Sequence, residues 1–228
     1  SPSRLSKMMP NGPAPAPTSR PTRDARAPTR MRTLALWLLT SLLGALLCLQ
    51  ELPGTLSEGR FYPADHDSYY HASRVEAALR DGGSVKQFDS RLHAPDGSWV
   101  PWPWGYDTLL LGIAQIGLAL SSASEPMTIL ALVAPAWFFL NQALLLGVAR
   151  QLGLAFGLQA LLLAFNSLLL LNRGLHRVGM LDHHYVELSF VLATLWAGLR
   201  WSKQPQSRRE AALLGSVLGL APSFHLSL

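Results

Sequence analysis

The sequence predicts an all-α polytopic membrane protein, and two observations lead to this fold class. Charged residues make up 14% of the chain and hydrophobic residues 49%, whereas about a quarter of a soluble domain is charged. Five stretches also contain no charged residue, namely 34–49, 108–124, 126–149, 151–172 and 211–224. Because about 20 apolar residues form a helix that crosses the hydrocarbon core of a bilayer, the longer stretches can span a membrane.

Residues 1–32 form a basic arm in front of the first apolar stretch. They contain seven bases and one acid, a net charge of +6, while the whole chain carries +5. The arm is rich in proline and cannot bury a hydrophobic core, so we expect it to be disordered. A basic flank before a first span is the usual signal that keeps the N-terminus in the cytoplasm. It therefore does not require nucleic acid as a partner.

Residues 33–50 are expected to form the first transmembrane helix, which leads out of the cytoplasm. No small-residue cleavage site follows in QELPGTLSEGRFY, which favours an uncleaved anchor over a signal peptide. Cys48 is the only cysteine and lies within this stretch. A disulfide framework and a cysteine zinc cluster are therefore excluded.

Residues 51–125 are expected to form a long, partly helical external loop. A helix is predicted from Ser68 onward, with Asp67 as its N-cap or as an acid of its first turn. Residues 104–122 are expected to form an interfacial or re-entrant helix. Counting them as a full span would place the basic loop 201–210 outside, against the positive-inside rule.

The remaining transmembrane helices are expected within residues 126–228. On this arrangement 126–149 run inward, 151–172 run outward and 185–200 return inward, so the stretch LDHHYVEL at 181–188 lies outside. We therefore expect a multi-pass protein of the cell membrane with a cytoplasmic N-terminus and an external active face. The surrounding membrane lipids are its first partners.

Two clusters of carboxylates and imidazoles lie on that external face. The first is ADHDSYYHASRVEAALRDG, residues 64–82, and the second is Asp182, His183, His184 and Glu187. Such groups at the edge of a bilayer are costly unless they are paired or hydrated, and they are candidates for function. Oxygen ligands with imidazoles suit Mn²⁺ or Mg²⁺, and the histidines also allow Zn²⁺. In the alternative interpretation, Asp67 and Asp182 cap helices, the second of which starts at His183, and Asp65, His66 and His71 are solvated loop groups.

Three stretches resemble the catalytic subunit of oligosaccharyltransferase in its archaeal and bacterial single-subunit form. DSYYH at 67–71, followed by Arg74, is similar to the first acidic motif of that family. FDSRLHAPDGSWVPWPWGYD at 88–107 resembles its external-loop stretch, and NRGLHRVGMLDHHYVE at 172–187 resembles its second motif. The resemblance covers roughly residues 34–220. It implies a transmembrane helical bundle of the GT-C glycosyltransferase type.

The resemblance implies a metal-dependent transfer of a glycan to protein. The donor would be a lipid-linked oligosaccharide on a polyprenyl (di)phosphate, and the acceptor would be Asn in an Asn-x-Ser/Thr polypeptide. Asp67 would be the catalytic acid that also binds the metal, and the other ligands would be Asp182 and His184. Secondary candidates near the metal are His93, His183 and Glu187. Arg173 and Arg177 are candidates for the carrier phosphate, with lipid headgroups as their alternative partners.

Two further motifs of the family are absent from the 228 residues, a Trp-Trp-Asp motif and a glutamate motif of a later external loop. We therefore expect the chain to be an N-terminal portion of a larger enzyme, or a truncated product, that is incomplete for transfer by itself. Two alternatives remain open. One is another GT-C transferase that acts on a lipid or glycan acceptor. The other is a non-catalytic membrane fragment or partner protein.

Overall fold

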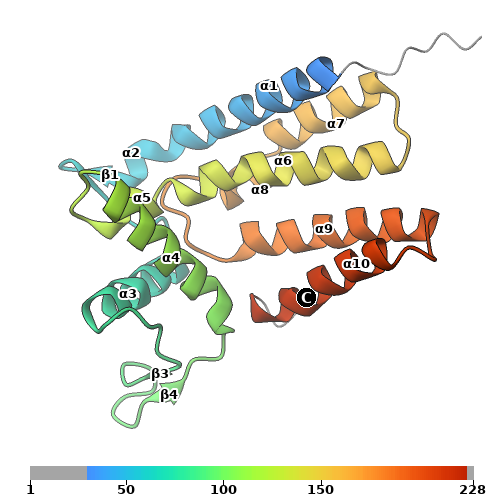
Figure 1. Cartoon of the computed structure of the whole chain (residues 1–228). Coiled ribbons are helices and arrows are strands. Elements are labelled where there is room, and N and C mark those ends of the chain that lie inside the picture. The colour runs from blue at the N-terminus through green and yellow to red at the C-terminus, as the bar shows by residue number, and fades with distance from the viewer. Residues whose placement is uncertain (1–29, 225–228) are drawn as a thin grey trace, which may run out of the picture.

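The computed structural model describes residues 30–224, so residues 1–29 of the expected basic arm lie outside the described part. The chain is mostly helical (Figure 1). Its helices are α1 (Arg30–Cys48), α2 (Leu52–Thr55), α3 (His66–Arg80), α4 (Trp104–Leu120), α5 (Pro126–Leu130), α6 (Val133–Gln151), α7 (Phe156–Leu168), α8 (Leu170–Leu175), α9 (His184–Lys203) and α10 (Arg208–Leu220). Short 3-10 turns follow α1 and α10, at Leu49–Glu51 and Ala221–Ser223.

The prediction of an all-α chain needs a small correction, because two antiparallel ladders are present. The first pairs β1 (Leu56–Ser57) with β2 (Arg60–Phe61), and the second pairs β3 (Phe88–Asp89) with β4 (Ser98–Trp99). Each strand has only two residues. Both ladders lie in the expected external loop, where β1–β2 closes a tight turn and β3–β4 closes the longer loop of residues 90–97.

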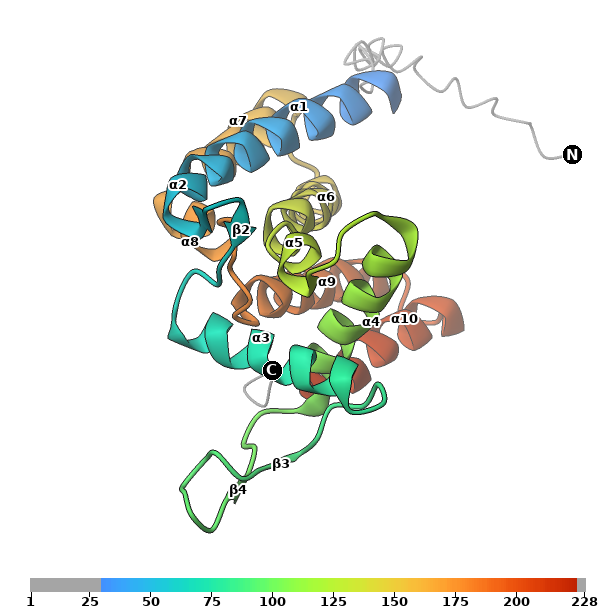
Figure 2. The same ribbon diagram turned by 90° about the vertical axis from the view of Figure 1, so that its left-hand side faces the viewer.

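Helix α6 lies at the centre of a helical bundle. It packs against α1 on one side and α9 on the other, while α7 packs on α1 and α10 on α9 (Figures 1 and 2). Gly44 allows the close approach of α1 to α6, because a Cβ atom there would lie 2.1 Å from the Phe138 ring. Phe138 is fully buried as a result.

Two helical segments are long and apolar enough to cross a bilayer, Arg30–Cys48 and Pro126–Gln151. They agree with the stretches expected at 33–50 and 126–149. The stretch expected at 151–172 differs, because it is divided into α7 and α8. The division falls at Leu169, whose extended backbone (ψ 118°) interrupts the helix, and the Asn172 side chain donates to the carbonyl of Asn166 across the break at 3.1 Å.

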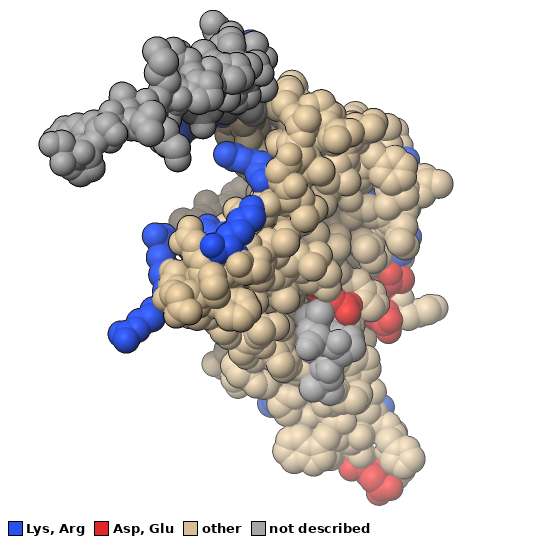
Figure 3. Space-filling view, turned by 90° about the vertical axis from the view of Figure 1, so that its right-hand side faces the viewer, with Lys and Arg blue, Asp and Glu red and all other residues tan. Residues whose placement is uncertain are grey.

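Helices α3 and α4 lie at one end of the bundle. Helix α4 packs against both α3 and α5 and runs across the direction of α6 and α9 (Figures 1 and 2). The α8–α9 connection, residues 176–183, lies at the same end. The opposite end is basic, since it holds the loops after α6 and α9 and the neighbouring Arg150, Lys203, Arg208 and Arg209 (Figure 3).

Candidate functional site

The first cluster is organised by the start of helix α3. The helix begins at His66, two residues before the expected Ser68, and its N-cap is Asp65. The extended backbone of Asp65 lets its side chain accept the Ser68 N–H at 2.9 Å. Capping by Asp67 was therefore a wrong prediction, and its alternative placement as a first-turn acid is correct. Because Asp65 satisfies the helix end, the exposed carboxylate of Asp67 remains available to other groups.

The structure joins the two clusters, which are more than a hundred residues apart in sequence. The Leu181 N–H donates to Ser68 Oγ at 2.8 Å, and the Arg177 guanidinium donates to Asp65 Oδ2 at 3.1 Å. Gly179 lies between these contacts at φ +77°, and a Cβ atom there would lie 2.6 Å from the Tyr62 carbonyl oxygen. The start of α3 is thus held directly against the chain that leads into LDHH.

Replacing Ser68 by alanine should weaken this junction. Ser68 is fully buried, so Ser68→Ala leaves the Leu181 N–H buried without its acceptor, at an expected cost of about 1–3 kcal/mol. The unfolding free energy of the purified protein in detergent would measure this loss. Ser73→Ala is the matched control, since Ser73 lies on the same helix and is only partly buried. Equal stability of the two variants would contradict the prediction.

Asp182 is the centre of the second cluster. Its Oδ1 lies 2.9 Å from His183 Nδ1 and its Oδ2 lies 3.3 Å from His184 Nε2. His184 Nδ1 in turn lies 2.9 Å from Glu187 Oε2. Helix α9 begins at His184 rather than at the expected His183, and its N-cap position is His183, without a side-chain cap. The alternative role of Asp182 as a helix cap is therefore wrong, and its carboxylate lies between two imidazoles instead.

The pKa values of this cluster reflect the mutual attraction of its charges. Burial acts to raise the pKa of Asp182, but the hydrogen bond of His183 and the charges of His183, His184 and His71 together hold that pKa below its usual value. Burial acts to lower the pKa of His184, but the Glu187 hydrogen bond and the charges of Asp182, Glu187 and Asp67 raise it overall. The charge of Asp67 contributes least to this shift of the His184 pKa, and Asp67 belongs to neither of the groups of described residues that could hold a metal ion.

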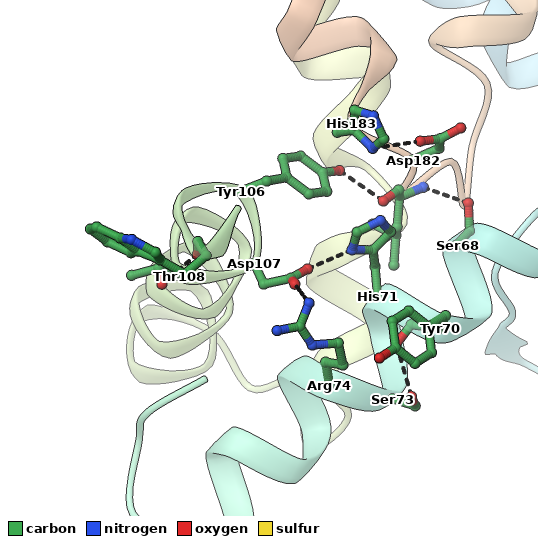
Figure 4. Close-up of polar contacts among 12 residues, drawn as sticks. Ser68, Tyr70, His71, Ser73, Arg74, Tyr106, Asp107, Thr108, Asp182 and His183 are labelled. Carbon is green, nitrogen blue, oxygen red and sulfur yellow. Dashed lines mark hydrogen bonds and ion pairs between the residues drawn. The ribbon is translucent and has the colours of Figure 1, made fainter. Parts of the chain in front are cut away.

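A buried triad of His71, Asp107 and Arg74 lies directly beneath this site (Figure 4). His71 Nδ1 lies 2.5 Å from Asp107 Oδ1, and the Arg74 guanidinium pairs with Asp107 Oδ2. At most 5% of each residue is exposed. The alternative interpretation of His71 as a solvated loop group is thus wrong. The sequence signal was present, because His71 and Arg74 are three residues apart on one helical face and Asp107 is the only charge in the apolar helix α4.

A network of polar side chains supports the α8–α9 connection from behind. Tyr106 donates to the Leu181 carbonyl at 2.9 Å and lies 2.9 Å from the Tyr185 hydroxyl. Asn141 of α6 donates to the Tyr185 carbonyl at 2.9 Å and lies 2.9 Å from His176 Nε2. All four side chains are essentially buried. Because buried polar groups that are fully paired fix a single arrangement, this network holds LDHH in place.

The remaining candidates lie around the edge of the site or away from it. His93 lies in the β3–β4 loop, which projects from the helices (Figures 1 and 2), and it belongs to neither of the groups of described residues that can hold a metal. Arg177 pairs with the cap residue Asp65. Arg173 donates to Gln50 Oε1 at 2.7 Å, which places it at the end of α1.

Two groups of three described residues present ligand atoms within 4.8 Å of one another. One consists of His71, Asp182 and His183, and the other of His183, His184 and Glu187. They combine imidazole nitrogen and carboxylate oxygen, which suits divalent transition metals. The chain is thus a helical bundle with these two groups of ligand atoms at one end, beside the crossing helix α4.

Solved structures of an archaeal oligosaccharyltransferase have the same fold. AglB from Archaeoglobus fulgidus, in complex with an inhibitory peptide and a dolichol-phosphate, is 17% identical with a TM-score of 0.70, over 85% of this chain and 23% of that chain. The Archaeoglobus fulgidus enzyme in complex with zinc and sulfate is 17% identical, with a TM-score of 0.68 and coverages of 83% and 25%. The same enzyme tethered to an acceptor peptide containing the NVT sequon is 17% identical, with a TM-score of 0.66 and coverages of 86% and 24%.

The resemblance that the sequence motifs indicate is therefore confirmed for the fold. The chain has the fold of part of an archaeal oligosaccharyltransferase and spans about a quarter of its length. No protein-family model and no curated protein sequence matches the chain. The likeness thus rests on the shared arrangement of helices.

Proposed function

We propose that the chain is part of a metal-dependent oligosaccharyltransferase. The enzyme transfers a glycan from a polyprenyl (di)phosphate carrier to Asn in an Asn-x-Ser/Thr acceptor. The single observation that carries this proposal is the direct contact between the two motifs, where Ser68 of the first accepts the backbone N–H of Leu181 beside the second. Motifs that resemble one family in sequence and meet in space on that family's fold support a shared activity.

The ligands and substrates follow by analogy with the solved relatives. Those structures contain a dolichol-phosphate, a sequon peptide, or zinc with sulfate. We assign a lipid-carried phosphate, an acceptor asparagine and a divalent cation to the end of the helical bundle that holds α3, α4 and the α8–α9 connection. Sulfate resembles a phosphate group in charge and shape, so its presence in a relative supports a phosphate-bearing donor.

The side chains present here fit a divalent cation. We assign Asp67, Asp182 and His184 as its ligands, with His183 and Glu187 beside them. Two carboxylates and one imidazole suit Mn²⁺ or Mg²⁺ and also allow Zn²⁺. When bound, such a cation stabilises the negative charge that develops on a phosphate leaving group.

Other residues of the chain bind and orient the substrates in this proposal. The exposed carboxylate of Asp67 can accept the N–H groups of the acceptor amide. The Arg173 guanidinium donates to the neutral side chain of Gln50, so its positive charge can serve the carrier phosphate. Arg177 pairs with Asp65 instead, and we assign it the role of holding the start of α3 against the second motif.

We further propose that the chain is a multi-pass membrane protein with the site outside. The basic end of the bundle (Figure 3) then lies in the cytoplasm, together with the N-terminus. Large apolar side chains cover the outer surfaces of α1 and α7, including Leu39, Leu46, Leu161 and Phe165, each more than 60% exposed. Such surfaces are stable against lipid or against further helices of the same enzyme.

Transfer of a labelled lipid-linked glycan to a sequon peptide tests the function. The complete gene product, reconstituted in lipid, should glycosylate a peptide that contains Asn-Val-Thr. It should lose this activity with a chelator and regain it with Mn²⁺ or Mg²⁺. The control peptide contains Gln in place of Asn and should remain unmodified. Transfer to a lipid or glycan acceptor with none to the sequon would contradict the proposal and favour another GT-C transferase.

A further inference from the structure

The imidazole of His71 has one nitrogen that the proposed function does not use. His71 is 1% exposed, its Nδ1 contacts Asp107, and its Nε2 is buried without a hydrogen-bond partner in the described structure. A buried polar atom without a partner costs about 1–3 kcal/mol. Figure 4 shows this ring between Asp107 and the Asp182–His183 pair. A bound ligand at Nε2 of His71 would remove this cost.

The contacts of Asp107 define the orientation of the His71 ring. Asp107 is paired with the buried guanidinium of Arg74, so one negative and one positive charge already balance. The Asp107 carboxylate is an acceptor, so the Nδ1–H group of His71 donates to it, and Nε2 of the ring points away from this contact. Metal-binding histidines have this arrangement, in which a carboxylate orients the ring from behind.

Asp182 and His183 provide the other donors on the same side. Ligand atoms of His71, Asp182 and His183 all lie within 4.8 Å of one another. In a tetrahedral site with metal–ligand distances of about 2.0–2.1 Å, the ligand atoms are roughly 3.4 Å from one another. Small rotations of the three side chains therefore bring their ligand atoms to one ion. His183 is 7% exposed and the carboxylate of Asp182 14%. The site is therefore buried, with His71 at its base.

We propose that His71, Asp182 and His183 form an inner binding site for a divalent cation of the zinc class. Two imidazoles and one carboxylate match the ligand type of many zinc sites, and they leave a fourth position open. The inner site shares Asp182 with the outer, more oxygen-rich site, whose other assigned ligands are Asp67 and His184. The two oxygens of Asp182 face different imidazoles, so one carboxylate can serve both sites. This inference goes beyond the proposed transfer, because it concerns a second ion.

Cobalt is the probe for this site, because Co²⁺ replaces zinc and absorbs visible light strongly in low-coordinate sites. The complete gene product in detergent is stripped of metal and titrated with CoCl₂. We expect an intense visible band in the natural protein, loss of that band in His71→Gln, and its retention in Asp67→Asn. His93→Gln removes an imidazole outside both groups and should retain the band. Asp107→Asn should weaken cobalt binding by about 10–100-fold.

Each outcome decides the proposal without a transfer assay. Retention of the band in His71→Gln would overturn it, and so would loss of the band in Asp67→Asn, which would mean a single site. If His71→Gln fails to fold, X-ray absorption of His184→Gln loaded with one equivalent of Zn²⁺ decides instead, because the two imidazoles left in the two groups are then those of His71 and His183. Two imidazoles around zinc support the inner site, and fewer than two overturn it. Because these readouts do not depend on glycan transfer, the inner site and the proposed function can fail independently.

Discussion

Asp182→Asn is expected to abolish metal-dependent glycan transfer. Asparagine has nearly the same shape but no negative charge, and the Asp182 carboxylate contacts both His183 and His184. Removing a residue that only hydrogen-bonds to a metal ligand lowers metal affinity by about 10–100-fold. Removing the ligand Asp182 itself should therefore lower metal affinity by at least about 100-fold. Since a bound ion stabilises the folded state in proportion to the logarithm of its affinity, the rise in melting temperature that Mn²⁺ or Zn²⁺ induces should nearly disappear.

The matched control is Asp96→Asn, because Asp96 is an exposed carboxylate in the β3–β4 loop. This variant should show the full metal-induced rise and full transfer. The measurement is a thermal melt with and without metal, paired with the sequon assay. A normal metal response in Asp182→Asn would show that LDHH is not a metal site.

Asp107→Ala is expected to destabilise the protein by about 3–5 kcal/mol. The change leaves the guanidinium of Arg74 buried without its ion partner, and removing one member of a buried pair carries a penalty of this size. It also removes the acceptor of His71 Nδ1. The unfolding free energy in detergent measures the effect.

Asp81→Ala is the comparison for this prediction. Asp81 also pairs with a base, Lys86, but their side chains are 46% and 66% exposed. Exposed pairs contribute little to stability, so the melting temperature should hardly change. If Asp81→Ala and Asp107→Ala lowered the melting temperature equally, burial of the Arg74–Asp107 pair would not matter for stability.

The fold could be predicted from sequence where composition decides the structure. The apolar stretches predicted α1 and α6, because a run of about 20 apolar residues favours a helix long enough to cross a bilayer. The break at Leu169 was missed, since nothing in the run 151–172 marks it. It depends on tertiary contacts, such as the hydrogen bond from Asn172 to the Asn166 carbonyl. The small ladders β1–β2 and β3–β4 were missed because two-residue strands leave no periodic pattern.

The site was predictable at the level of its motifs and not at the level of their contacts. The sequence placed Asp67 and Asp182 on one face because charge patterns indicate the side of the membrane. It could not show that Asp65, rather than Asp67, caps α3, because capping depends on backbone angles. His71 and Asp107 were missed as partners because their contact joins α3 to α4. Only the packing of these two helices reveals it.

The hydrogen bond between Ser68 and Leu181 joins positions 113 residues apart, and this separation has a consequence for biosynthesis. Ribosomes add about 5–20 residues per second, so on the order of ten seconds pass between the synthesis of the two partners. During that time α4 can already pack against α3, but the start of α3 lacks its contact with the second motif. The start of α3 and the α8–α9 connection are therefore expected to be among the last parts of the protein to become protease-resistant as the chain is made.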